Sequence, residues 1–323
     1  MRWAITVKNA LESVYKRFPR LAGYAGKLIF ALCCLFLLRA NCGYNELISN
    51  TWVMLVIGIF CAFAPAKVLV LILVIYALVQ FFTLSSGVGV ICALILMAAY
   101  LIYFRFGPSY IYLMLLIPVL SMARLPLLVP LILAVTGSFD MLAVIIFGDL
   151  IYYMIRYVNL NAAVISGMTD QSEYAKMTLA AKGIFTNVEF LYTAVIFIVV
   201  FLLIHYMKRI NINQANSLSI CAGGGLYIIL SLIANLIFEM LTVSRLVNIV
   251  AGAAAAVIIA VIIVYALLPL DYTRLETFEF EDDEYHYYVR AIPKVVISKE
   301  SVRVKEINTR KEISTEKAKE KER

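Results

Sequence analysis

Charged residues are scarce in this sequence. Asp, Glu, Lys and Arg make up 15% of its 323 residues, whereas about 25% is usual for a soluble domain. Apolar residues make up 63% and form long runs between residues 28 and 268. No soluble fold can bury so many entirely apolar helices, but a run of about 20 apolar residues spans a bilayer. The fold is therefore expected to be an all-α, polytopic transmembrane helix bundle.

The residue patterns of common chemistries are also missing. None of the six cysteines belongs to a CxxC pair or a Cys/His cluster, which argues against a zinc site and a disulfide framework. There is no Walker loop, nucleophile elbow or zinc-helix motif. We therefore expect no cofactor, no metal and no enzymatic activity.

The excess of positive over negative charge lies in the apolar part of the chain. Residues 1–270 contain 16 Lys and Arg against 8 Asp and Glu, while residues 271–323 contain 12 and 13. Nucleic-acid binding needs a basic face on a soluble domain, and the sequence offers none. The excess instead fits membrane topology and lipid headgroups, so the lipid bilayer is the expected partner.

Three regions follow from this distribution: a basic amphipathic segment over 1–27, a transmembrane domain over 28–268 and a charged tail over 269–323. In the first, apolar residues recur at helical spacing, which predicts a short interfacial helix that ends at Pro19. A solvated basic leader is the alternative. The basic residues place both termini in the cytoplasm of a multi-pass plasma-membrane protein.

About eight spans are expected, with a long loop over 159–187. They are residues 21–38, 50–65, 67–84, 87–104, 139–158, 188–206, 217–240 and 247–268.

The segment 109–137 lies between the fourth and fifth spans and differs from both. It is apolar at each end but has Arg124 in its middle and three prolines around it. A charge at mid-bilayer costs about 2.5–3.5 kcal/mol on insertion scales, and an interior proline removes a helix hydrogen bond. Two half-helices in a re-entrant hairpin, with Arg124 near the turn, are therefore expected. If the segment spans fully, every later loop changes side.

Asp149 lies inside the fifth span. An ionisable residue at that depth normally faces the bundle interior or a cavity. Arg124 is its expected partner, and Arg156, seven residues on and on the same helix face, is the alternative. The group would form an ion, proton or anionic-substrate site, or else a structural ion pair. Asn235 and Glu239, four residues apart, are expected to share a second polar face.

The tail has two parts. Its first part contains the acidic residues Glu281, Asp282 and Asp283, followed by a β-prone run from Tyr285 to Ile292. The rest is Lys/Glu-rich, so the charged tail is expected to be mostly disordered. The acidic residues with Tyr285, Tyr287 and Tyr288 could bind a protein partner by adding a strand to its sheet.

Several stretches together resemble a family of uncharacterised polytopic membrane proteins of Gram-positive anaerobic bacteria. They are RFGPSY, VPLILAVTG and, most specifically, FEFEDDEYHYYVRAIPK. This resemblance implies a class of membrane protein and no mechanism.

A second, local resemblance involves LPLLVPLILAVTGSFDMLAVIIFGDL. Its prolines and its Gly148-Asp149 pair are similar to a pattern in the substrate-binding membrane component of energy-coupling-factor vitamin transporters. The chain has more expected spans than such components and lacks their Gly-Pro after the hairpin, so the similarity implies shared helix packing.

Two functions remain after these exclusions. The first is a transport or permease component whose pathway is lined by the broken hairpin and the Asp149 span. The alternative is a cell-envelope assembly or scaffold protein that recruits a partner through its C-terminal tail.

Overall fold

The computed structural model of the chain describes residues 18–106, 108–168, 172–210, 215–267, 276–281 and 286–291. The chain divides into two units, Met1–Pro269 and Leu270–Arg323. Because their mutual placement is not defined, each is described by itself. Of the amphipathic segment expected over 1–27, residues 1–17 lie outside the described residues, whereas residues 19–27 form the first part of the long helix α2 (Pro19–Cys42).

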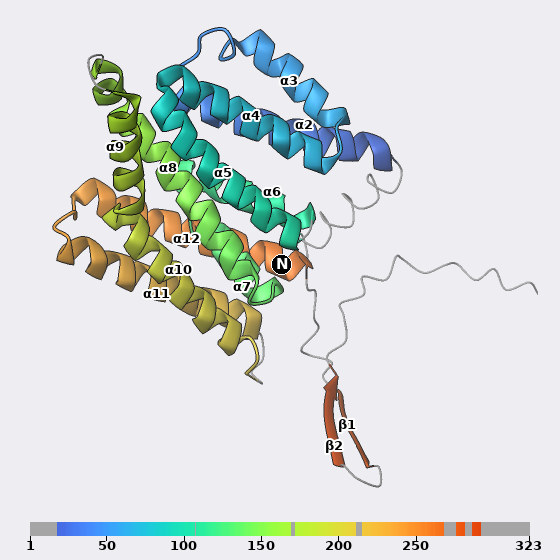
Figure 1. Ribbon diagram of the computed structural model, residues 1–323. Helices are drawn as coiled ribbons and strands as arrows, with labels where there is room; N and C mark the ends of the chain where they lie inside the picture. The colour runs from blue at the N-terminus through green and yellow to red at the C-terminus, as the bar shows by residue number, and fades with distance from the viewer. Residues whose placement is uncertain are drawn as a thin grey trace, which may run out of the picture. The chain divides into compact units, whose positions relative to one another are not determined.

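The first unit is all-α (Figure 1). Its helices, in chain order, are α2 (Pro19–Cys42), α3 (Thr51–Phe63), α4 (Ala66–Leu84), α5 (Ser86–Phe106), α6 (Pro108–Met122), α7 (Leu128–Thr136), α8 (Met141–Gly167), α9 (Glu173–Phe185), α10 (Val188–Met207), α11 (Ala215–Ile237) and α12 (Val243–Leu267).

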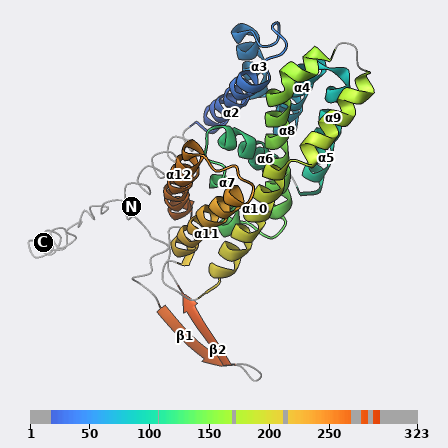
Figure 2. The same ribbon diagram turned by 90° about the vertical axis from the view of Figure 1, so that its left-hand side faces the viewer.

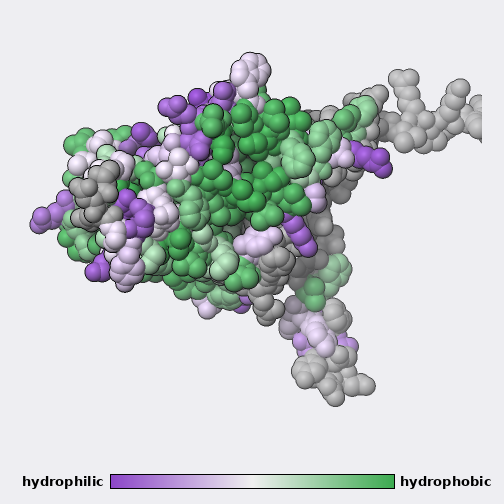
Figure 3. Space-filling view, turned by 45° about the horizontal axis from the view of Figure 1, so that its top comes forward, coloured by the Kyte–Doolittle hydropathy of each residue, from purple (hydrophilic) through white to green (hydrophobic). Residues whose placement is uncertain are grey.

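Six helical segments of the described chain are long and apolar enough to cross a membrane. They are Arg20–Cys42, Ala66–Leu84, Met141–Gly167, Glu173–Met207, Ala215–Ile237 and Val243–Tyr265. Figure 3 shows hydrophobic side chains over a broad part of the surface, a pattern that suits lipid and is unfavourable in water. The chain is a polytopic membrane protein. The expectation of eight spans is confirmed only in part, because α3, for example, has 13 residues.

The proline-rich segment forms two short helices, as expected. Helix α6 tolerates Pro118 in its interior and ends at Met122, and α7 begins at Leu128. Arg124 lies in the turn with a left-handed backbone, φ 63°. The Leu125 N–H donates to the Leu120 carbonyl at 2.8 Å, which satisfies a carbonyl at the end of α6.

Helix α7 lies inside the bundle. It packs against α10, α11 and α12 as well as α6 and α8 (Figures 1 and 2), and most of its side chains are buried. Lys208, just after α10, caps the C-terminal end of α7. The Lys208 Nζ donates to the carbonyls of Ala134, Val135 and Gly137 at 2.9, 3.0 and 3.2 Å.

Helix α8 connects the two halves of the bundle. It packs on α2, α4, α5, α6 and α9 and also on α7 and α10. Its expected end at residue 158 is too early, because the helix continues to Gly167. The asparagines at 159 and 161 end the apolar run, but the alanines at 162 and 163 favour helix.

The long loop expected over 159–187 is also wrong. Most of it is the end of α8 and all of α9. Only Thr186 and Asn187 separate α9 from α10, and the Asn187 side chain caps α10 by accepting from the N–H groups of Glu189 and Phe190. A capping side chain of this kind starts a new helix where the previous one ends.

The second unit contains an antiparallel hairpin, β1 (Glu276–Glu281) and β2 (His286–Ala291), in the register Glu276 to Ala291 and Glu281 to His286. The expected β-prone run is confirmed as β2. The first strand, β1, lies in a part of the tail for which no strand was predicted and includes only Glu281 of the acidic residues. Thr277, Phe278 and Phe280 give β1 the β propensity that its glutamates lack.

Candidate functional site

A polar cavity of about 380 Å³ lies inside the helical unit. Five charged residues line it: Arg124, Asp149, Arg156, Glu189 and Arg245. Charges inside a membrane bundle are costly and are normally retained for function or paired. This cavity is therefore the candidate site.

Breaks in the helices bring these charges together. Arg124 lies in the turn between α6 and α7, and Glu189 follows the break between α9 and α10. Arg245 lies in the first turn of α12, after the short connection from α11. All three face the middle part of α8, which contributes Asp149 and Arg156. Broken helices of this kind expose polar groups inside membrane proteins.

Glu189 forms ion pairs with two arginines. Its Oε2 lies 2.7 Å from Arg156 Nη1, and its Oε1 lies 2.7 Å from Arg245 Nη2. The Glu189 side chain is 16% exposed. Arg245 Nη1 also donates to Asn235 Oδ1 at 3.1 Å. This network joins α8, α10, α11 and α12, and the Glu189 carboxylate forms ion pairs with both guanidinium groups.

Arg124 has a different partner. Its Nη1 donates to Asn248 Oδ1 at 2.9 Å. Gly252, one turn further along α12, faces the same turn: a Cβ there would lie 2.5 Å from the Arg124 carbonyl oxygen. Asn248 and Gly252 therefore fix α12 against the hairpin turn.

Asp149 is almost fully buried, at 1% exposure. Its Oδ2 has no hydrogen-bond partner among the described residues, and the same holds for Ser121 Oγ of α6. Both residues line the cavity. Buried polar atoms without partners are rare and call for an explanation. The expected Arg124–Asp149 ion pair is absent, because the Arg124 side chain is hydrogen-bonded to Asn248 of α12 instead.

Tyrosines complete the lining. Tyr152, Tyr153, Tyr192 and Tyr227 all face the cavity. The Tyr153 hydroxyl lies 3.0 Å from Thr193 Oγ1. Their hydroxyl groups provide donors and acceptors beside the charges, so the cavity suits a polar ligand.

Asn235 and Glu239 do not share the predicted polar face. Asn235 lines the cavity, but Glu239 lies beyond the end of α11, exposed and with φ 53°. A helix C-terminus in a left-handed conformation changes the chain direction, so the four-residue spacing no longer places the two residues on one face.

Sequence reasoning missed Glu189 and Arg245. Each lies at the start of a helix, where charges usually face the membrane interface. Their signal was topological: α10, α11 and α12 alternate in direction, so the starts of α10 and α12 meet at the same end. Opposite charges at those two starts could have indicated an ion pair.

In the tail, Glu281, Tyr287 and Tyr288 lie in the hairpin, with Tyr288 78% exposed. The predicted partner-binding residues Asp282, Asp283 and Tyr285 lie outside the described residues.

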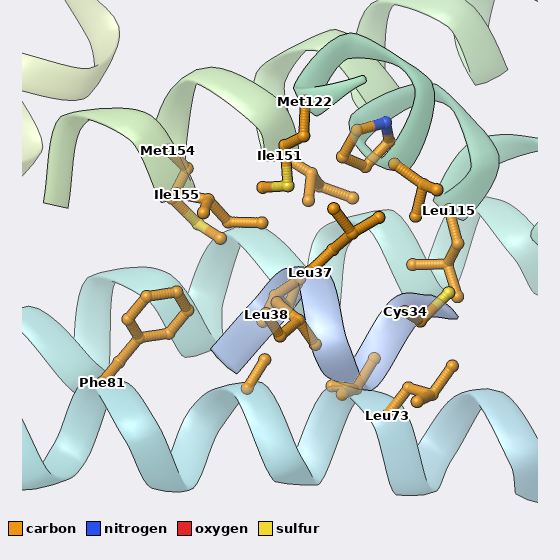
Figure 4. A pocket seen from close by; sticks show the side chains of 15 residues that line it. Cys34, Leu37, Leu38, Leu73, Phe81, Leu115, Met122, Ile151, Met154 and Ile155 are labelled. Carbon is orange, nitrogen blue, oxygen red and sulfur yellow. The ribbon is translucent and has the colours of Figure 1, made fainter. Parts of the chain in front are cut away.

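A second pocket, of about 50 Å³, lies among α2, α4, α6 and α8 (Figure 4). Leu38, Leu73 and Phe81 are typical of its lining, which carries no charged or hydroxyl-bearing side chain. It is a packing defect of the apolar core and offers no chemistry. Within the described chain, no group of three or more His, Cys, Asp or Glu could hold a metal.

Comparisons with protein-family models, with curated proteins and with solved structures find no match for the chain.

Proposed function

We propose that the protein is a membrane transport component that binds a small anionic solute in the polar cavity. The supporting observation is the charge balance of that cavity, which contains three arginines and two carboxylates. Glu189 is shared by Arg156 and Arg245, and the hydrogen-bond partner of the Arg124 side chain among the described residues is the neutral amide of Asn248. Positive charge is therefore in excess at the arginines, which favours an anion.

The arginines also suit the ligand geometrically. A guanidinium presents a planar fork of donors that matches a carboxylate, phosphate or sulfate. The guanidinium groups of Arg156 on α8 and Arg245 on α12 already meet at one carboxylate, that of Glu189. An incoming anion can compete with it and loosen the contact among α8, α10 and α12. Such a competition links anion binding to helix movement.

The first test is the thermal stability of the protein purified in mild detergent, measured with sulfate, phosphate, L-glutamate or citrate against chloride at equal ionic strength. Because a ligand that binds only the folded state raises the unfolding midpoint, at least one of these anions should raise it. The increase should be lost in Arg124→Gln and in Arg245→Gln.

Arg39→Gln is the matched control, since Arg39 is exposed and lies outside the cavity. It should keep the full increase. Equal stabilisation of all three variants would contradict an anion site at the arginines.

The transport proposal places both termini in the cytoplasm and α6–α7 as a re-entrant hairpin. It is supported by the basic residues of the leader and the tail, and by the central position of α7 among α10, α11 and α12.

A scaffold function is the second candidate, and the β1–β2 hairpin favours it. The two-stranded sheet has two unpaired edges, and Phe278 and Tyr288 are exposed on it. An unpaired edge is a template for a partner strand. Affinity purification with and without residues 271–323 should then give different partners. Identical partner sets would eliminate this candidate.

A further inference from the structure

The polar cavity is lined by a carboxyl, that of Asp149, to which none of its arginines is paired. Asp149 and Arg156 are seven residues apart on α8, which corresponds to about 10 Å along the helix axis. Arg156 belongs to the Glu189 network. Asp149 is 1% exposed and makes no ion pair with any described residue.

Uncharged polar groups line the cavity of Asp149 from the neighbouring elements. Tyr153 on α8 and Tyr227 on α11 are close enough to interact electrostatically with it. Ser121 lines the cavity from α6 and Thr193 from α10. On the other side of α8, the helices α2 and α4 contribute only apolar side chains to the small pocket (Figure 4).

The charged residues of the same cavity are the three arginines and Glu189, and none of them is bonded to Asp149. The titratable groups that remain in the lining are tyrosines. Asp149 is therefore the single carboxyl of this cavity that is free to gain or lose a proton without breaking an ion pair.

A metal cation does not fit this position. Hard cations need several oxygen ligands, whereas Asp149 belongs to no group of three or more His, Cys, Asp or Glu among the described residues. A proton is the cation that one buried carboxyl can hold, because it converts a costly buried charge into a neutral acid.

We propose that Asp149 binds a proton together with the anion, so that the transporter carries the two together. The proposal rests on the function proposed above. The proton is taken from water when the anion enters the cavity, forms an O–H bond with the Asp149 carboxylate, and returns to water on the other side when the anion leaves. The bond that breaks on uptake is an O–H bond of a hydronium ion, and release to water on the other side forms a hydronium ion again.

The coupling follows from the fixed charge of the cavity. With three arginines and two carboxylates, that charge is +1 when Asp149 is ionised and +2 when it is protonated. Protonation therefore strengthens anion binding through a low-dielectric interior. By linkage, a bound anion favours protonation to the same extent.

The test is sulfate binding to the purified full-length protein, measured by calorimetry between about pH 6 and pH 8. Sulfate is suitable because its own charge does not change in this range. For the wild type, the affinity should rise as the pH falls, by up to about tenfold per pH unit for a single linked proton. Asp149→Asn imitates the neutral acid, so it should bind tightly at every pH.

Asp140→Asn is the matched control. Asp140 precedes the same helix but is exposed and outside the cavity, so this variant should keep the wild-type pH dependence. The proposal is overturned if Asp149→Asn keeps the wild-type slope, or if it loses sulfate binding at every pH, which would make Asp149 a direct ligand contact. Absence of sulfate binding in the wild type, together with no stabilisation by the other anions, would instead remove the anion site and the coupling with it.

Discussion

Arg124 adopts a backbone conformation that few side chains tolerate. Its φ of 63° costs an L-residue roughly 1–2 kcal/mol, yet a large charged side chain occupies this turn. Strain of this kind persists where surrounding structure enforces it, and it is concentrated at functional sites. The contact with Asn248 and the approach of Gly252 supply that enforcement.

Replacing Arg124 separates its backbone role from its charge. Arg124→Gly should be more stable than Arg124→Ala by about 1 kcal/mol, because glycine adopts the left-handed turn without steric cost. Both variants should lose stabilisation by anions. Thermal unfolding with and without sulfate measures both effects, and a Gly variant that retains the anion effect would show that the guanidinium is dispensable.

Glu189 is the residue on which the ion network depends. Glu189→Gln leaves Arg156 and Arg245 without a counter-charge, and loss of one partner from a partly buried network should cost about 2 kcal/mol. An added anion should restore much of this loss, because it can take the place of the missing carboxylate. A variant that is destabilised but insensitive to anions would mean that the two arginines are closed to solutes.

At the scale of elements, α7 depends on the cation at its C-terminal end. Lys208 donates to two carbonyls of its last turn, at Ala134 and Val135, and to that of the following Gly137, and each buried acceptor left without a donor costs about 1–3 kcal/mol. Lys208→Met should therefore lower stability and speed amide exchange across α7. Lys182→Met, at an exposed position of α9, is the control. Unchanged exchange in α7 would show that its packing alone holds it.

The β hairpin should be sensitive to acid. The His286 ring lies 2.7 Å from Glu279 Oε1, and this hydrogen bond, with a second from Tyr288, holds the pKa of Glu279 below its usual value. Such a carboxyl stabilises the hairpin fully above the pKa of the unfolded chain. The contribution is lost as the pH falls through the lower pKa of the folded state.

Amide exchange of β1 and β2 in the full chain, corrected for the intrinsic effect of pH, measures this change. Protection should fall between about pH 5 and pH 2 and be weaker, with a smaller pH dependence, in Glu279→Gln. Protection that does not vary with pH would show that the side-chain contact is irrelevant to the hairpin.

Across the whole molecule, hydropathy was enough to predict most of the helices but not which of them are long enough to cross a membrane. The two half-helices around Arg124 were predictable because proline and a charge interrupt an apolar run locally. Helix α9 was not, since its amphipathic sequence resembles a loop when only apolar runs are counted.

The site was predictable as a set of unusual residues and not as a set of partners. Four of the predicted polar residues line the cavity: Arg124, Asp149, Arg156 and Asn235. Each interrupts an apolar run, and a polar side chain is costly where it faces lipid, so it turns to the interior of the bundle. Their partners depend on where distant helices begin and on one left-handed turn. A single sequence does not encode such contacts in any local pattern.

The central claim is that anions cross the membrane through this cavity. The most direct measurement is counterflow in proteoliposomes: vesicles loaded with unlabelled sulfate are diluted into radiolabelled sulfate, and the label inside is counted. Transient accumulation is expected with the wild type and with Arg39→Gln, and none with Arg245→Gln. Equal accumulation in all three would exclude a transport path at Arg245, and so would its absence from the wild type with every anion that stabilises the protein.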